Sequence, residues 1–475
     1  MNDMVWSFLA LTGLITAFGA ISVTRRRKTT GDYLVASREV KPWLAALSAV
    51  ATNNSGFMFI GMIAYTYRLG IEAVWMMAGW VLGDLTAWFL VHPRVRRISG
   101  ERRANTLPAL LGSGSGSGPD RLLIAVAGVV TFLFLGVYAA GQLKAGSTAL
   151  RALFGWQMEV GALIGAAIVV IYCFAGGIRA TIWTDAVQSL VMIATMVMIL
   201  VAGFLEIGGW QAVAANLRDQ DPALVNLMPA EPALGFGFYL AGFMFAGFGV
   251  IGQPQIMVRL IAIESVEAIR SARFFYFLWY IPFFLASIGV GLYCRALIPD
   301  LAELPVAQGL EAPTELALPL ITMRLLPDIV VGIALAGLFA ATISTADSQI
   351  IVCSGSVTND INPRWKKSYL ASKASTLSIG ALALLIALYA PEGVFGLVLV
   401  AWSVLGASLG SVLLLRLYNR ALSLPTALAM MGAGVVAVVG WHLSPYNDDV
   451  FKILPGFVAA FAVYLLSRLK RFRPT

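Results

Sequence analysis

Charged residues are scarce in this chain, because Asp, Glu, Lys and Arg make up only 12% of its 475 residues. Hydrophobic residues make up 59%, and the mean hydropathy is +0.82, a composition that soluble domains do not have. Three cysteines and two histidines are too few for a disulfide framework or a histidine-based metal site. We therefore expect one polytopic membrane domain over residues 1–475, embedded in a lipid bilayer, without nucleic-acid binding despite a net charge of +8.

Long apolar runs recur along the chain, and a run of about 20 such residues crosses a bilayer as a helix. The sequence predicts an all-α protein with about thirteen transmembrane spans, at 5–24, 43–67, 72–92, 121–146, 160–176, 181–205, 235–258, 274–294, 328–354, 372–390, 394–415, 424–442 and 451–467. The basic cluster 25–28 follows the first span instead of preceding it. We therefore expect this segment to stay as a span, because a signal peptide carries its charges first.

Basic residues also predict the orientation, because cytoplasmic loops are enriched in Lys and Arg. With the N-terminus outside, 26 of the 33 basic residues fall on the inner side and the other seven on the outer side. The C-terminus is then cytoplasmic, as expected for a plasma or inner membrane protein. The Gly/Ser run at 113–118 is typical of a flexible linker, and the short loops favour a monomer.

Two polar segments lie halfway through apolar spans, at 51–56 and 341–348. Asn53 is about ten residues into its span, which places it about 15 Å deep, and Ser344 and Thr345 lie at a similar depth. Small residues often serve only to pack membrane helices closely. Two clusters of neutral oxygens at one depth instead favour a site for a small hard cation such as Na⁺.

Both halves of the chain contain a span that is poor in helix formers. The first contains Asn53-Asn54-Ser55-Gly56, and the second contains the Gly-rich stretch 246–254, which ends in Pro254. Interrupted spans at corresponding positions of two halves indicate the binding site of a secondary transporter. We expect two five-helix repeats, of spans 2–6 at 43–206 and spans 7–11 at 235–416.

Several motifs resemble those of the sodium/solute symporter family, and most closely its sodium/proline symporters. They are Asp32-Tyr33-Leu34 with Arg38, the segment 47–56, Gly176-Gly177-Ile178-Arg179-Ala180 with Trp183 and Asp185, Gly252-Gln253-Pro254, and Ser344-Thr345 with Asp347-Ser348. The resemblance implies a LeuT-type 5+5 inverted repeat. It also implies sodium-coupled import of a small solute by alternating access.

The same resemblance implies where sodium binds. The ligands would be the backbone carbonyls of Ala51, Asn54 and Ala341 and the hydroxyls of Ser344 and Thr345. These five oxygens agree with the depth of the two polar segments.

Some members of the family bind a second sodium ion, and Asp185, Asp347 and Ser348 are the candidates for it here. The alternative is that the two carboxylates line an inner vestibule near Arg179 or Arg259.

The resemblance is weaker at the substrate pocket. Tyr138 stands at the position of a pocket tyrosine, whereas Ala246 and Val250 replace aromatic residues and Asn53 replaces a carboxylate. These replacements predict a roomier, less aromatic pocket. The candidate substrate contacts are Asn53, Ser55, Tyr138, Ala246, Val250 and Gln253.

Lys144 near the outer end of its span has two interpretations. It either reaches the outer headgroups or binds a substrate carboxylate.

The expected function is symport of an amino acid such as proline. The alternatives are symport of another organic acid, a sugar or a vitamin-like solute, or a transporter-like sensor. The sequence contains none of the short hydrolase or metalloprotease motifs, so an enzyme is not expected.

Overall fold

A computed structural model describes residues 2–23, 34–113, 118–230, 232–310, 312–366, 368–390, 393–420, 422–447 and 449–471. Within these ranges the chain forms helices and no strand, apart from one isolated bridge between Val40 and Ile263. The basic cluster 25–28, the Asp32-Tyr33 motif and positions 114–117 of the Gly/Ser run lie outside the described residues.

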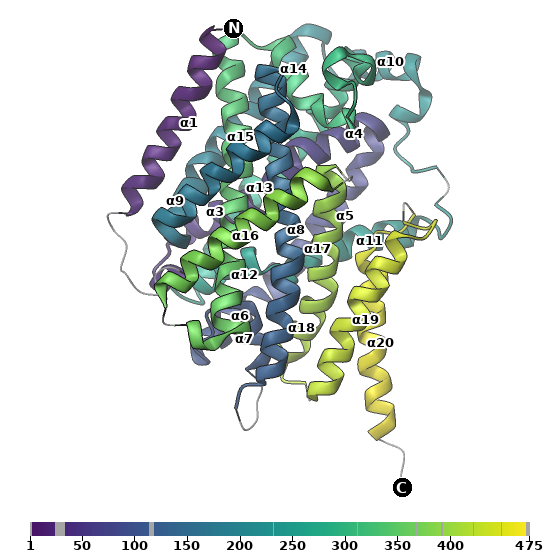
Figure 1. Cartoon of the computed structure of the whole chain (residues 1–475). Coiled ribbons are helices and arrows are strands. Elements are labelled where there is room, and N and C mark those ends of the chain that lie inside the picture. The colour runs from purple at the N-terminus through teal and green to yellow at the C-terminus, as the bar shows by residue number, and fades with distance from the viewer. Residues whose placement is uncertain are drawn as a thin grey trace.

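The helices follow the order of the predicted spans, and each predicted span overlaps at least one of them (Figure 1). The first half contains α1 (Asn2–Val23), α3 (Pro42–Gly56), η2 (Phe57–Met62), α4 (Ile63–Leu69), α5 (Val74–Leu90), α6 (His92–Glu101), α7 (Leu107–Gly112), α8 (Arg121–Phe154), α9 (Met158–Ile207) and α10 (Trp210–Gln220). The second half contains α11 (Phe236–Phe248), η5 (Gly249–Gly252), α12 (Pro254–Ala262), α13 (Ala268–Leu297), η8 (Pro313–Leu316), α14 (Ala317–Leu325), α15 (Asp328–Gly355), η9 (Ser356–Ile361), α16 (Tyr369–Tyr389), α17 (Val394–Leu405), η11 (Gly406–Gly410) and α18 (Ser411–Leu417). The chain closes with α19 (Leu424–His442) and α20 (Ile453–Arg471), which pack against each other.

The number of spans stays a prediction. By length and composition, eight helices in the described part of the chain can cross a membrane, or nine if the bent pair 236–252 and 254–262 is one span. One of the eight, Pro42–Glu101, contains two of the predicted spans. Figure 1 places the start of α1 and the end of α20 at opposite ends of the bundle, as an odd number of spans requires.

Close packing of α5 on α11 joins the two halves. A Cβ atom on Gly83 would lie 1.8 Å from the carbonyl oxygen of Met244, and one on Gly247 would lie 1.9 Å from that of Trp80. These two backbones therefore touch, and only glycine fits at either position. Small residues serve this purpose in membranes, where packing and not the hydrophobic effect holds helices together.

Candidate functional site

The break predicted in span 2 lies at Ser55. This residue has φ 47° and ψ −160° inside α3, and the chain continues beyond Gly56 as the π-helical segment η2. A non-glycine residue with positive φ is strained, and such strain clusters at ligand sites. The amide of Gly56 donates to Oε1 of Gln142 on α8 at 2.9 Å, so a side chain replaces the helical acceptor lost at the break.

The break lies against the polar segment of α15. A Cβ atom on Gly56 would come within 2.7 Å of Cγ2 of Thr342, so the two helices are in direct contact there. Two and three residues further along α15, the hydroxyls of Ser344 and Thr345 donate to the carbonyl of Ala341, at 3.4 Å and 2.9 Å. Each hydroxyl oxygen keeps lone pairs that can ligate a cation.

Asn54 offers an acceptor that the sequence did not indicate. Its Nδ2 donates to the carbonyl of Val50 at 2.7 Å, whereas its Oδ1 is buried without a hydrogen-bond donor. Buried acceptors are nearly always satisfied. A cation at the break would satisfy this one, in addition to the backbone carbonyl predicted from the sequence.

The candidate residues of the second sodium site come together around Arg259 of α12. Asp185 on α9 and Arg259 form a salt bridge of 2.8 Å, with side chains 1% and 0% exposed. Oδ2 of Asp185 also accepts from Ser48 at 2.6 Å and from Thr52 at 3.4 Å. Ser48 and Thr52 lie one turn apart on α3. The salt bridge between Asp185 and Arg259 therefore connects the broken helix to α9 and α12.

Arg259 also engages α15. Its Nη2 donates to Oγ of Ser348 at 2.7 Å, and Oδ1 of Asp347 accepts from Ser348 at 3.3 Å and from Thr181 at 3.1 Å. A guanidinium therefore contacts two of the three residues proposed for the second sodium ion. Arg179, the other arginine considered from the sequence, instead donates to the carbonyl of Ala36 at 3.0 Å.

The second predicted break separates α11 and η5 from α12, with a bend of 56°. Nε2 of Gln253 donates to the carbonyls of Trp402 at 2.9 Å and Gly249 at 3.3 Å. Nε1 of Trp402 in turn donates to the carbonyl of Ala246 at 2.8 Å. Gln253 and Trp402 therefore satisfy backbone groups that the break frees, as irregular backbone at membrane depth requires.

The predicted substrate residues lie in three places. The side chain of Tyr138 on α8 lies beside that of Ser55, so these two residues meet at the first break. Val250 is buried in η5 at the second break. Asn53 points elsewhere, because its Nδ2 lies 3.4 Å from Oδ2 of Asp84 on α5 and donates to the hydroxyl of Tyr276 on α13.

Aromatic side chains reach the breaks from helices that the sequence did not single out. The ring of Trp80 on α5 lies 5.8 Å from that of Phe57 and 5.5 Å from that of Trp402. Aromatic surface is therefore present despite the small residues Ala246 and Val250. Twelve tryptophans spread along the chain gave no signal that these two would meet.

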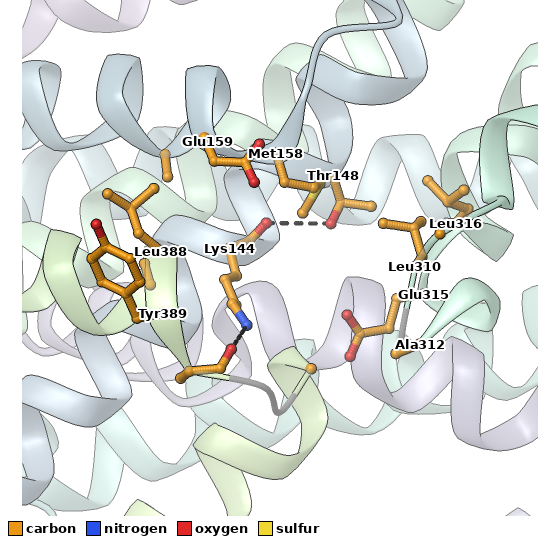
Figure 2. A pocket seen from close by; sticks show the side chains of 15 residues that line it. Lys144, Thr148, Met158, Glu159, Leu310, Ala312, Glu315, Leu316, Leu388 and Tyr389 are labelled. Atoms are coloured by element: carbon orange, nitrogen blue, oxygen red, sulfur yellow. Dashed lines mark hydrogen bonds between the residues drawn. The ribbon is translucent and has the colours of Figure 1, made fainter.

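Lys144 lies in a cavity of about 350 Å³ between α8, α9, η8 and α16 (Figure 2). Its ammonium donates to the carbonyl of Ala390, and Glu159 and Glu315 line the same cavity. Figure 2 shows the side chains of Lys144 and Glu315 on the cavity wall. The proposed contact between Lys144 and a substrate carboxylate stays a prediction.

Comparison with known proteins relates the chain to sodium-coupled transporters. The model of the Sodium:solute symporter family matches residues 33–434. The chain is 29% identical over 455 residues to the high-affinity proline transporter PutP of Bacillus subtilis, with 94% of each protein covered. It is 29% identical over 463 residues to a sodium/proline symporter of Escherichia coli, covering 95% of this chain and 90% of the other.

Solved structures show the fold. A Na⁺-coupled sialic acid symporter in a substrate-bound, outward-open state matches with a TM-score of 0.79 at 20% identity, over 99% of this chain and 98% of that one. Mhp1, a transporter of the nucleobase-cation-symport-1 family, matches with a TM-score of 0.58 at 14% identity, over 94% and 96%. Both have the LeuT-type fold, which confirms the predicted fold class.

Proposed function

The chain belongs to the sodium:solute symporter family, and from this premise we propose that it imports a small amino acid such as proline together with Na⁺. The observation that carries the proposal is the strained break at Ser55, packed through Gly56 against the hydroxyl-rich turn of α15. Sodium coupling and membrane transport follow from the family. We propose, in addition, the substrate, the sodium ligands and the orientation in the membrane.

Sodium would bind between α3 and α15. The ligands are the carbonyls of Ala51, Asn54 and Ala341 and the hydroxyls of Ser344 and Thr345. The buried, unpaired Oδ1 of Asn54 supports a cation at this place. Neutral oxygens hold a monovalent ion loosely enough to release it, which transport requires.

A second sodium ion at Asp185, Asp347 and Ser348 would need Arg259 to move. The guanidinium already donates to Asp185 and Ser348, and two cations cannot share these oxygens at a distance of a few Å without strong repulsion. We propose that this site fills only in a conformation in which the Asp185–Arg259 bridge has opened. A stoichiometry of one sodium per substrate would contradict a second site.

The names of the two curated relatives support proline as the first substrate to test. Tyr138 and Ser55 would contact it beside the first break, and Ala246, Val250 and Gln253 belong to the second. Another organic acid, a sugar or a vitamin-like solute remains the alternative, because Asn53 faces away toward Asp84.

For the arrangement in the membrane, we propose the N-terminus outside, the C-terminus in the cytoplasm and a monomer.

Uptake of radiolabelled proline into proteoliposomes tests this function. An inward Na⁺ gradient should drive accumulation that an inward choline gradient does not, and unlabelled proline should compete better than sugars. Accumulation of another solute, with proline inactive as a competitor, would keep the symporter and reject the substrate. Proline uptake that is insensitive to Na⁺ would reject the proposed coupling.

A further inference from the structure

The buried carboxylate of Asp84 on α5 is not part of the proposed sodium sites. It is fully buried, and its Oδ2 accepts from the hydroxyl of Tyr276 at 2.6 Å and lies 3.4 Å from Nδ2 of Asn53. Asn53 also donates to that hydroxyl, so the three side chains form a closed triangle between α3, α5 and α13. Oδ1 of Asp84 is buried without a hydrogen-bond donor.

No lysine or arginine in the described ranges forms a salt bridge with Asp84. The titratable neighbours on α13 are the phenols of Tyr276 and Tyr280, and α3 contributes the neutral Asn53. On the α11 side, Gly83 packs on the backbone of Met244 and Phe248. His92, two helical turns from Asp84 along the chain, packs on the ring of Trp88 at 4.6 Å.

Asp84 and Asp185 differ in whether a positive charge lies beside the buried carboxylate. Asp185 is equally buried, but Arg259 compensates its charge at 2.8 Å. A buried carboxylate without such a partner is very costly unless a cation binds to it. The cation that needs no further ligands is the proton, and the unpaired Oδ1 can accept it.

We propose that Asp84, together with Asn53 and Tyr276, forms a proton-binding site coupled to sodium binding at the break in α3. The proton comes from water and returns to water, so the charge of the triangle alternates between 0 and −1. Asn53 transmits this change, because it lies two residues before the break at Ser55. This proposal depends on the proposed sodium site only because the experiment measures sodium binding.

The direction of coupling follows from electrostatics. A negative Asp84 attracts a cation at the neighbouring break, so sodium should bind more tightly as the pH rises. Coupling is reciprocal, so sodium binding should release protons from the protein. We expect the apparent sodium affinity to change by about tenfold, within the usual range of such couplings.

Two measurements on the purified full-length protein test the proposal. The first is binding of radioactive Na⁺ between about pH 5.5 and about pH 8.5, a range chosen to include the titration of buried carboxyls. The second is proton release on adding NaCl in weakly buffered solution, read with an indicator dye. Asp84→Asn should bind Na⁺ with an affinity independent of pH and should release no protons.

Matched variants separate this site from the others. Asp360→Asn removes another buried carboxyl, one bonded to Thr106 at 2.8 Å, and should keep the proton release. Thr345→Val should lose tight sodium binding at every pH. If Asp84→Asn does not fold, the exchange variant Asn53→Asp/Asp84→Asn keeps one carboxylate in the triangle and should still release protons.

Three results would overturn the proposal. One is a wild-type sodium affinity that does not change with pH, and another is full proton release by Asp84→Asn. The third is a folded Asp84→Asn that cannot bind sodium at all, which would make Asp84 a direct sodium ligand. Absence of sodium binding in the wild type would instead overturn the proposed function.

Discussion

The Asp185–Arg259 pair allows a quantitative prediction, because its burial sets the size of the effect. At 2.8 Å and an effective dielectric constant of about 20, the Coulomb attraction is about 6 kcal/mol. Desolvation of both groups offsets much of it, so the intact pair contributes little net stability. Removing one partner leaves a buried charge without compensation, which costs about 3–5 kcal/mol.

We predict that Arg259→Met and Asp185→Asn each lower the free energy of unfolding by about 3–5 kcal/mol. The double variant contains neither charge, so it should be more stable than the sum of the single losses implies. Together the wild type, the two single variants and the double variant form a double-mutant cycle. The interaction energy between Asp185 and Arg259 from this cycle should lie near the upper end of the usual range, about 0.5–3 kcal/mol. Unfolding of the purified proteins in detergent measures all four free energies.

An exposed ion pair of similar length is the control. Lys41 and Glu264 are 3.0 Å apart, but their side chains are 67% and 36% exposed. Lys41→Met should cost less than about 1 kcal/mol, because water screens this pair. Equal losses for Lys41→Met and Arg259→Met, or additive losses in the cycle, would refute the argument that burial decides the effect.

Further predictions concern the two breaks and the packing between the halves. Thr345→Val removes a proposed ligand, so the apparent sodium affinity in uptake should fall at least about tenfold, while the melting temperature changes little. An unchanged sodium affinity would exclude Thr345 as a ligand. Gly56→Ala places a methyl group 2.7 Å from Ala145 and Thr342, so transport should fall sharply, and normal uptake would show that α3 and α15 separate easily. Gly247→Ala should prevent stable folding, because its Cβ would meet the Trp80 backbone at 1.9 Å, whereas Gly432→Ala on α19, with open space around it, should fold and elute normally in size-exclusion chromatography.

Local sequence predicted the features that depend on backbone chemistry. The run Asn53–Gly56 and the segment before Pro254 mark breaks because they combine poor helix formers with apolar flanks, and the structure bends at both places. The predicted spans likewise overlap helices, because hydrophobic length is a local property.

Side-chain partners were less predictable, because they depend on residues far apart in sequence. Arg259 lies 74 residues from Asp185, and Tyr276 lies 223 residues from Asn53. The sequence left open whether Arg179 or Arg259 would face the carboxylates. Nothing in it indicated that Asn53 would turn toward Asp84, away from the residues beside Tyr138.

These partners make α3 the helix through which Asp185 and Asp84 affect the break. Ser48 and Thr52 are one helical turn apart and face Asp185, whereas Asn53 lies about 100° further round the helix and faces Asp84. Either carboxylate can therefore influence the proposed sodium ligands between α3 and α15 without contacting the ion bound there. If this is correct, Ser48→Ala and Asn53→Ala should each change sodium affinity, and only Asn53→Ala should also alter its dependence on pH.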